Sequence, residues 1–70
     1  MKIQIILEYK DKTYKSDIDE LTEDEYNSLT GLIEQFSQGK GGYFRFDSGD
    51  KQHYFNKQIL KQSIITIIKT

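Results

Sequence analysis

The segment Leu21–Tyr26, with the sequence LTEDEY, carries the most specific local signal in the chain. The Thr22 hydroxyl can accept a hydrogen bond from the amide of Glu25, and the Glu25 carboxylate can reach back to the amide of Thr22. This reciprocal pattern is a capping box. Leu21 before the cap and Tyr26 after it have the spacing of a hydrophobic staple. The segment therefore predicts the start of a helix.

Apolar residues continue from this start at helical spacing, and Gly39 suits a carboxyl-terminal cap. We predict a helix from Glu23 to Gln38. Its apolar stripe consists of Tyr26, Leu29, Ile33 and Phe36, with Leu32 beside them.

The chain before the helix predicts a β-hairpin. Apolar and polar residues alternate from Ile3 to Tyr9, turn residues follow at Lys10–Lys12, and alternation resumes from Thr13 to Ile18. Ile6 is the exception, because it lies with the polar residues of the first strand.

The chain after the helix predicts a second hairpin and a last strand. Strands at Tyr43–Asp47 and Lys51–Asn56 flank a turn, and Asn56 is a suitable amino cap for one helical turn. The final strand, Ile64–Ile68, is apolar on both faces apart from Thr66. Such a strand fits a central position in a sheet, or an outer face that something else covers.

Together these elements predict an α+β fold in the order ββαββ, a short helical turn, then β. We expect one domain over residues 1–70, with the helix packed on a mainly antiparallel sheet of about five strands. The strand order within the sheet stays open.

Composition narrows the function. The chain has no cysteine and one histidine, so we expect no cofactor, no thiolate metal site and no metal centre. A net charge of −1 disfavours binding to nucleic acid. No stretch approaches the roughly 20 apolar residues of a membrane span, and no signal-peptide pattern is present, so we expect a cytoplasmic protein with no membrane partner.

The charges gather in one place, since six of the nine residues from Asp17 to Glu25 are acidic. This run is either a solvated helix start, where the helix dipole favours acids, or a surface for a basic partner. The candidate interface residues here are Asp19, Glu20, Glu23 and Asp24.

No catalytic constellation is evident. A hydrolase or nuclease would use His53, the only histidine, with Asp47 or Asp50, but no nucleophile has a distinctive setting. We therefore predict a protein that is not an enzyme and keep a His-dependent hydrolase as an alternative.

A second alternative is single-stranded nucleic-acid binding. Tyr43, Arg45 and Tyr54 form a candidate aromatic site on which bases could stack. The competing interpretation is ordinary cross-strand pairing of aromatic residues.

Three isoleucines lie opposite the predicted helix-facing core, and together they would form an apolar interface patch: Ile6, Ile64 and Ile68. The alternative is a two-sided core in which Ile59 and Leu60 cover the second face. The patch favours a protein-binding module whose partner is another protein or a second copy of the chain, as in a homodimer.

Three segments resemble, in style, the small uncharacterised accessory proteins of phages and mobile elements from AT-rich bacteria: Lys2–Tyr9, Leu21–Tyr26 and Tyr54–Ile65. The resemblance implies a modulator or inhibitor that binds a host or defence protein. It assigns no role to any residue.

Overall fold

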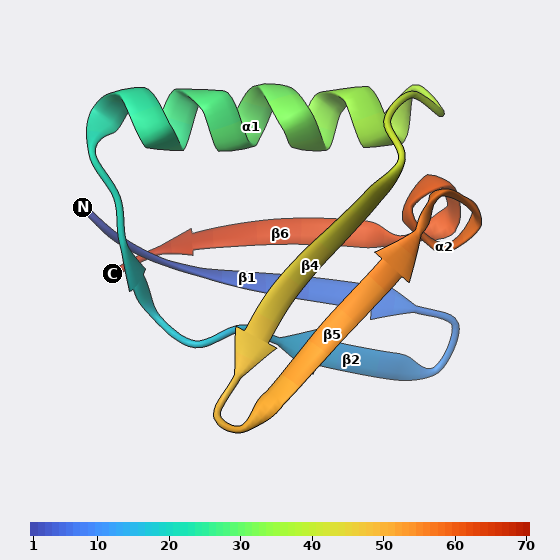
Figure 1. Cartoon of the computed structure of the whole chain (residues 1–70), viewed down its shortest axis with the longest axis horizontal. Coiled ribbons are helices and arrows are strands. Elements are labelled where there is room, and N and C mark those ends of the chain that lie inside the picture. The colour runs from blue at the N-terminus through green and yellow to red at the C-terminus, as the bar shows by residue number, and fades with distance from the viewer.

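The computed structural model describes all 70 residues, Met1–Thr70, and has the α+β architecture that the sequence predicts. One long helix packs over antiparallel strands, and a short second helix precedes the last strand (Figure 1). The elements are β1 (Lys2–Tyr9), β2 (Lys12–Lys15), β3 (Asp19–Glu20), α1 (Glu23–Ser37), β4 (Tyr43–Ser48), β5 (Lys51–Asn56), α2 (Lys57–Gln62) and β6 (Ile64–Lys69).

Strand β1 is the centre of the larger sheet. It pairs antiparallel with β6 along one edge, and with β2 and then β3 along the other. Its alternate residues Ile3, Ile5 and Leu7 are 1%, 5% and 0% exposed, as the period-2 pattern predicts. This face of β1 is the floor of the core.

Strands β2 and β3 form one strand interrupted by a β-bulge. Leu7 pairs with Tyr14 and Ile3 with Asp19, so four steps along β1 match five steps along the facing chain. The bulge is stabilised at Ser16, whose hydroxyl accepts the amide hydrogen of Ile5 at 2.8 Å. The predicted continuous strand from Thr13 to Ile18 is therefore wrong in its second half.

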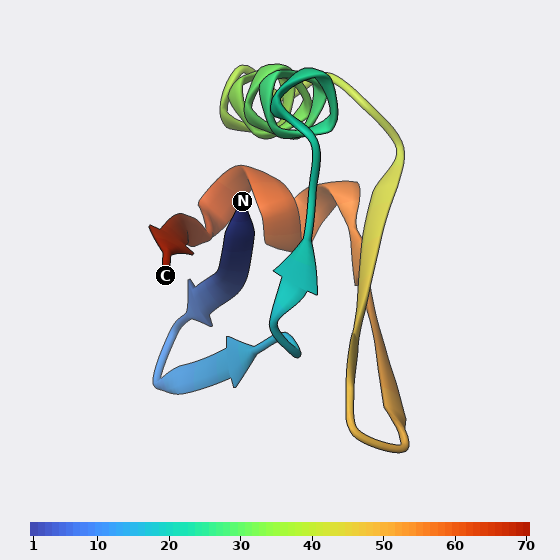
Figure 2. The ribbon, with the colours of Figure 1, turned by 90° about the vertical axis from the view of Figure 1, so that its left-hand side faces the viewer.

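Strands β4 and β5 form a separate hairpin rather than extending the first sheet. The hairpin crosses the β1–β6 sheet obliquely and lies in a layer of its own (Figures 1 and 2). Phe44, Phe46 and Phe55 point into the core, each less than 10% exposed. The single sheet expected from the sequence is divided because these aromatic residues close the side of the core that α1 leaves open.

Helix α1 begins as predicted and ends one residue early. Both capping-box bonds are present: the Thr22 amide donates to Glu25 Oε1 at 2.9 Å and the Glu25 amide to Thr22 Oγ1 at 3.2 Å. Phe36 is buried, but Leu32 is 38% exposed and lies at the margin of the apolar stripe. The helix end has the bonds of a Schellman motif, because the Lys40 amide donates to the Gln35 carbonyl and Gly39 has a φ of 77°.

The link between α1 and β4 requires a second glycine. Gly41 has a φ of 90°, and a Cβ at this position would lie 2.8 Å from Cε1 of Phe36. Gly41 thus lets the chain turn closely around the buried Phe36 ring.

Helix α2 starts at the predicted cap, where the Asn56 side chain accepts from the Ile59 amide at 3.0 Å. Leu60 is 2% exposed and belongs to the same core as α1, and Ile59 packs against that core. The alternative of a second core beneath this helical turn is therefore wrong. The core contains Ile3, Ile5, Leu7, Phe36, Phe44, Phe46, Phe55 and Leu60.

We expect Thr22→Ala to lower the free energy of unfolding by about 1 kcal/mol, because the first turn loses its cap. For a domain of this size the melting midpoint should fall by roughly 4–8 °C. Ser28→Ala is the matched control, since Ser28 is an exposed hydroxyl residue in the same helix that makes no side-chain hydrogen bond. Thermal unfolding followed by circular dichroism measures both, and equal midpoints for the two variants would contradict the assigned role of the cap.

Candidate functional site

The three candidate isoleucines share the face of the larger sheet that points away from the core. Register places Ile68 opposite Gln4 and Ile64 opposite Glu8, on the face that also carries Ile6. Ile64 is 66% exposed and Ile68 40% exposed, whereas Ile6 is half-buried between its neighbours. Helix α1 and the β4–β5 hairpin lie on the other side (Figure 2). We call this the outer face.

The outer face continues into a free strand edge. Strand β6 pairs with β1 and with no other strand. The Thr70 amide donates to the Lys2 carbonyl, and alternate residues of an antiparallel strand face the same neighbour. The backbone groups of Ile65, Ile67 and Lys69 therefore point outward from the sheet. No proline or bulge interrupts this edge, and Lys69 carries its one charge.

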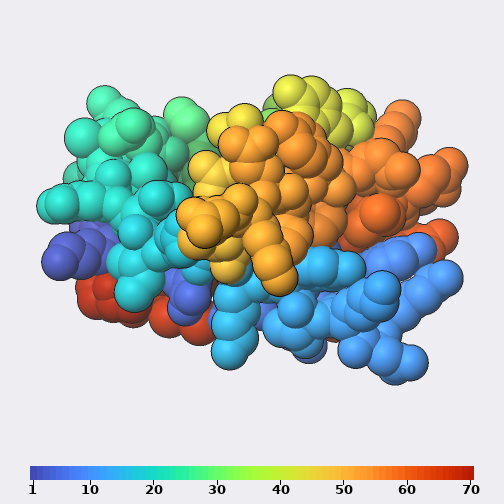
Figure 3. Space-filling model, turned by 60° about the horizontal axis from the view of Figure 1, so that its bottom comes forward, coloured from blue at the N-terminus to red at the C-terminus, as the bar shows by residue number.

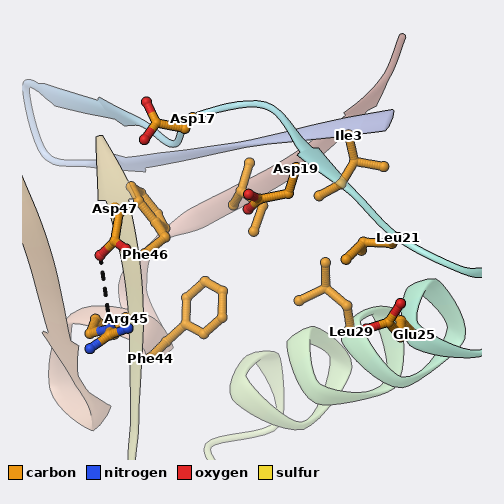
Figure 4. Close-up of a pocket in the computed structure, with 11 residues that line it drawn as sticks. Ile3, Asp17, Asp19, Leu21, Glu25, Leu29, Phe44, Arg45, Phe46 and Asp47 are labelled. Atoms are coloured by element: carbon orange, nitrogen blue, oxygen red, sulfur yellow. Dashed lines mark ion pairs between the residues drawn. The ribbon is translucent and has the colours of Figure 1, made fainter. Parts of the chain in front are cut away.

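The acidic stretch divides between two environments. Asp19 lines a groove of about 340 Å³ between β3, the start of α1 and β4 (Figure 4). Glu20, Glu23 and Asp24 do not line this groove. The walls and floor of the groove are apolar and consist of Ile3, Ile5, Leu21, Leu29, Phe44 and Phe46. Its polar rim consists of Asp17, Asp19, Glu25, Asp47 and Arg45. We call this the acidic groove.

Hydrogen bonds between the bulge and the β4–β5 hairpin support the rim of the acidic groove. The Asp17 carboxylate accepts from the Gly49 amide at 3.0 Å and 3.1 Å, and the Asp17 amide donates to the Asp47 carbonyl at 2.9 Å. These bonds hold the β4–β5 turn beside the bulge, where the two segments form a continuous surface (Figure 3). The bulge therefore positions both Asp17 and Asp47.

The rim is predominantly anionic at neutral pH. Hydrogen bonds from Thr22, first from its backbone and then from its side chain, lower the pKa of Glu25 from its ordinary value of 4.5. Arg45 is the one cation of the rim, and its Nε lies 3.9 Å from an Asp47 oxygen (Figure 4). No hydrogen bond or ion pair engages the Asp19 carboxylate.

The aromatic candidates lie on the solvent side of the β4–β5 hairpin. Tyr43 is 67% exposed and Tyr54 60% exposed, and their ring centroids are 6.5 Å apart. The Arg45 guanidinium lies 6.0 Å from the Tyr54 ring. The pKa of Arg45 is raised, mainly by a hydrogen bond with the Tyr54 side chain and next by the negative charge of Asp47. The three side chains form one exposed aromatic and cationic strip.

His53 lies on the opposite side of the same hairpin, among aromatic rings. Its ring is 5.3 Å from Tyr14, 5.8 Å from Phe46 and 6.2 Å from Phe55, measured between centroids. No carboxylate is hydrogen-bonded or ion-paired to the imidazole. The structure contains no group of three or more histidine, cysteine, aspartate or glutamate residues that could hold a metal ion.

Sequence reasoning placed Asp19 among the candidates but missed the groove around it. Asp17 and Asp47 are distant in sequence, and they meet only because the bulge re-aims the chain after Ser16. No local pattern in the sequence signals that meeting.

Comparison with known proteins assigns no family: no protein-family model, curated protein or solved structure matches the chain. No helix in the structure is both long enough and apolar enough to cross a membrane.

We expect Asp17→Ala to loosen the β4–β5 turn, because it removes the carboxylate that accepts from Gly49 and leaves only the backbone bond between Asp17 and Asp47. The Gly49 amide loses a charged acceptor, so its hydrogen exchange should accelerate by about tenfold. Asp50→Ala is the matched control, because Asp50 is an exposed carboxylate in the same turn without a hydrogen bond or ion pair. Amide exchange followed by nuclear magnetic resonance measures both variants. Unchanged exchange at Gly49 in Asp17→Ala would refute the role of the Asp17 carboxylate in holding the two sheets together.

Proposed function

We propose that this chain is a non-catalytic protein-binding module that engages its partner through β6 and the outer face. The observation that carries the proposal is the combination of exposed Ile64 and Ile68 with an unpaired backbone edge on the same strand. The edge supplies hydrogen bonds to an added strand, and the isoleucines supply apolar area beside it.

Self-association is the simplest form of this interaction. Natural edge strands are guarded by charges, proline or bulges, and β6 has only Lys69 at its end. A second copy of β6, placed antiparallel, would bring the two sets of isoleucines onto one continuous face. The resemblance to phage and mobile-element accessory proteins makes a host or defence protein the alternative partner, and the cysteine-free composition suits the reducing cytoplasm.

The surroundings of His53 support a role without catalysis. A general base needs an orienting partner and access to a nucleophile, and this imidazole packs against Tyr14, Phe46 and Phe55 instead. Hydrolytic turnover that His53→Ala abolishes would favour the rival hydrolase.

We expect the double variant Ile64→Lys, Ile68→Lys to remove the association while keeping the fold, because Ile64 is 66% exposed, Ile68 is 40% exposed and neither belongs to the core. Ile18→Lys is the matched control, since Ile18 is 57% exposed but lies outside β6. Light scattering after size-exclusion chromatography reports self-association, and a pull-down from the source cell reports another partner.

The wild type and Ile18→Lys should associate, and the double variant should remain monomeric and capture nothing. If the double variant still associated, the interface would lie outside Ile64 and Ile68. Absence of any association in the wild type would overturn the proposal.

Single-stranded nucleic-acid binding is the second candidate, and the exposed strip of Tyr43, Arg45 and Tyr54 favours it. Stacking on such rings is worth about 1–3 kcal/mol per base. The acidic groove lies beside the strip and shares Arg45 with it, so phosphate groups would meet repulsion there.

We therefore expect no change in the fluorescence anisotropy of a labelled oligothymidylate at physiological salt. Binding that Tyr54→Ala removes and Ile18→Ala retains would instead establish the strip as the functional surface. Ile18 is a suitable control because it is 57% exposed and lies outside the β4–β5 hairpin that carries the strip.

A further inference from the structure

We propose that the acidic groove binds a lysine or arginine side chain, together with an adjacent apolar residue, from a segment of another protein. The groove lies on the core side of the β1 sheet, opposite the outer face, so this interaction does not rest on the association proposed for β6. The chemistry of its walls and of its rim selects the ligand.

The walls select a ligand with a hydrocarbon body. Six apolar residues line the groove, and they come from β1, the β3–α1 junction, α1 and β4. A volume of about 340 Å³ is at the lower end of the range for ligand pockets. It accommodates one or two side chains rather than a folded element. Lysine and arginine have apolar stems that pack on such walls while the charged end stays at the rim.

The rim selects a positive charge. Four carboxylates, Asp17, Asp19, Glu25 and Asp47, stand against one guanidinium, that of Arg45. The four carboxylates come from four different segments: Asp17 from the bulge, Asp19 from β3, Glu25 from the first turn of α1 and Asp47 from β4. The negative charges therefore surround the opening of the groove (Figure 4). An anion would meet repulsion from several directions.

The carboxylates differ in how far they are already engaged. Asp17 accepts from the Gly49 amide, and one oxygen of Glu25 accepts from the Thr22 amide. Asp47 has a long ion pair with Arg45 at 3.9 Å, between side chains that are about half exposed. Asp19 has no partner, and it stands on the rim above the apolar walls (Figure 4). Asp19 is therefore the principal acceptor for the incoming cation.

The other acidic residues of the Asp17–Glu25 stretch lie outside the acidic groove. Glu20, Glu23 and Asp24 add to the negative field of this end of the molecule, but they do not line the groove. They can attract a basic segment from solution, and they make no contact with a side chain held inside. This difference supplies the matched control.

The test uses the tripeptide acetyl-Leu-Lys-Leu-amide and the uncharged peptide acetyl-Leu-norleucine-Leu-amide, in which a hydrogen replaces the lysine ammonium. Each peptide is titrated into the labelled 70-residue protein, and binding is followed by the amide chemical shifts of the protein. The lysine peptide should shift the amides of Asp19, Leu21 and Phe44–Asp47 and should bind more tightly than the norleucine peptide.

Asp19→Asn should lower the affinity for the lysine peptide by about threefold, as expected for the loss of a partly solvated ion pair. Asp24→Asn should leave the affinity for this peptide nearly unchanged. Asp19 makes no hydrogen bond through its side chain, so the amide spectrum of the variant should remain that of a folded protein.

Equal affinities for the two peptides would overturn the proposal. Equal weakening by Asp19→Asn and Asp24→Asn would also overturn it, because it would indicate a diffuse field rather than a site. The double variant Ile64→Lys, Ile68→Lys should bind the lysine peptide like the wild type, so failure of the groove and failure of the β6 interface are distinguishable.

Discussion

The two-sided pairing of β1 is the constraint on which the rest of the structure depends. Its alternation places Ile3, Ile5 and Leu7 on one face, where they are almost completely buried beneath α1 and the β4–β5 hairpin. The same strand holds β6 on one edge and the bulged β2–β3 strand on the other. Only nine of the 70 residues are buried, and three of them lie on β1. A core this small has no other set of buried residues that could replace those of β1.

The bulge at Ser16 connects the β1 sheet to the β4–β5 hairpin. One extra residue opposite β1 leaves the Ile5 amide without a backbone acceptor, and the Ser16 hydroxyl accepts its hydrogen instead. The chain is thereby re-aimed so that Asp17 reaches the β4–β5 turn. A structural irregularity of one residue thus joins two sheets and brings Asp17 beside Asp47 on the rim of the acidic groove.

The features that the sequence predicted are those set by near neighbours. The capping box needs only Thr22 and Glu25, the Asn56 cap needs only the next three residues, and the burial of β1 follows from its alternation. The division into two sheets and the bulge depend on contacts between distant segments. Asp17 and Asp47 each read as ordinary turn or surface acids, because nothing near either residue indicates that they meet.

The two proposed surfaces follow from the alternation of one strand. Odd-numbered residues Ile3 and Ile5 lie beneath the acidic groove, whereas even-numbered Ile6 belongs to the outer face. A partner on β6 would add a strand at the sheet edge and leave the core-side residues where they are. A basic side chain in the groove would contact the opposite face of the same strand. Because β1 is paired along both edges, it stands between the two proposed surfaces, so a partner on one surface would not displace a partner on the other.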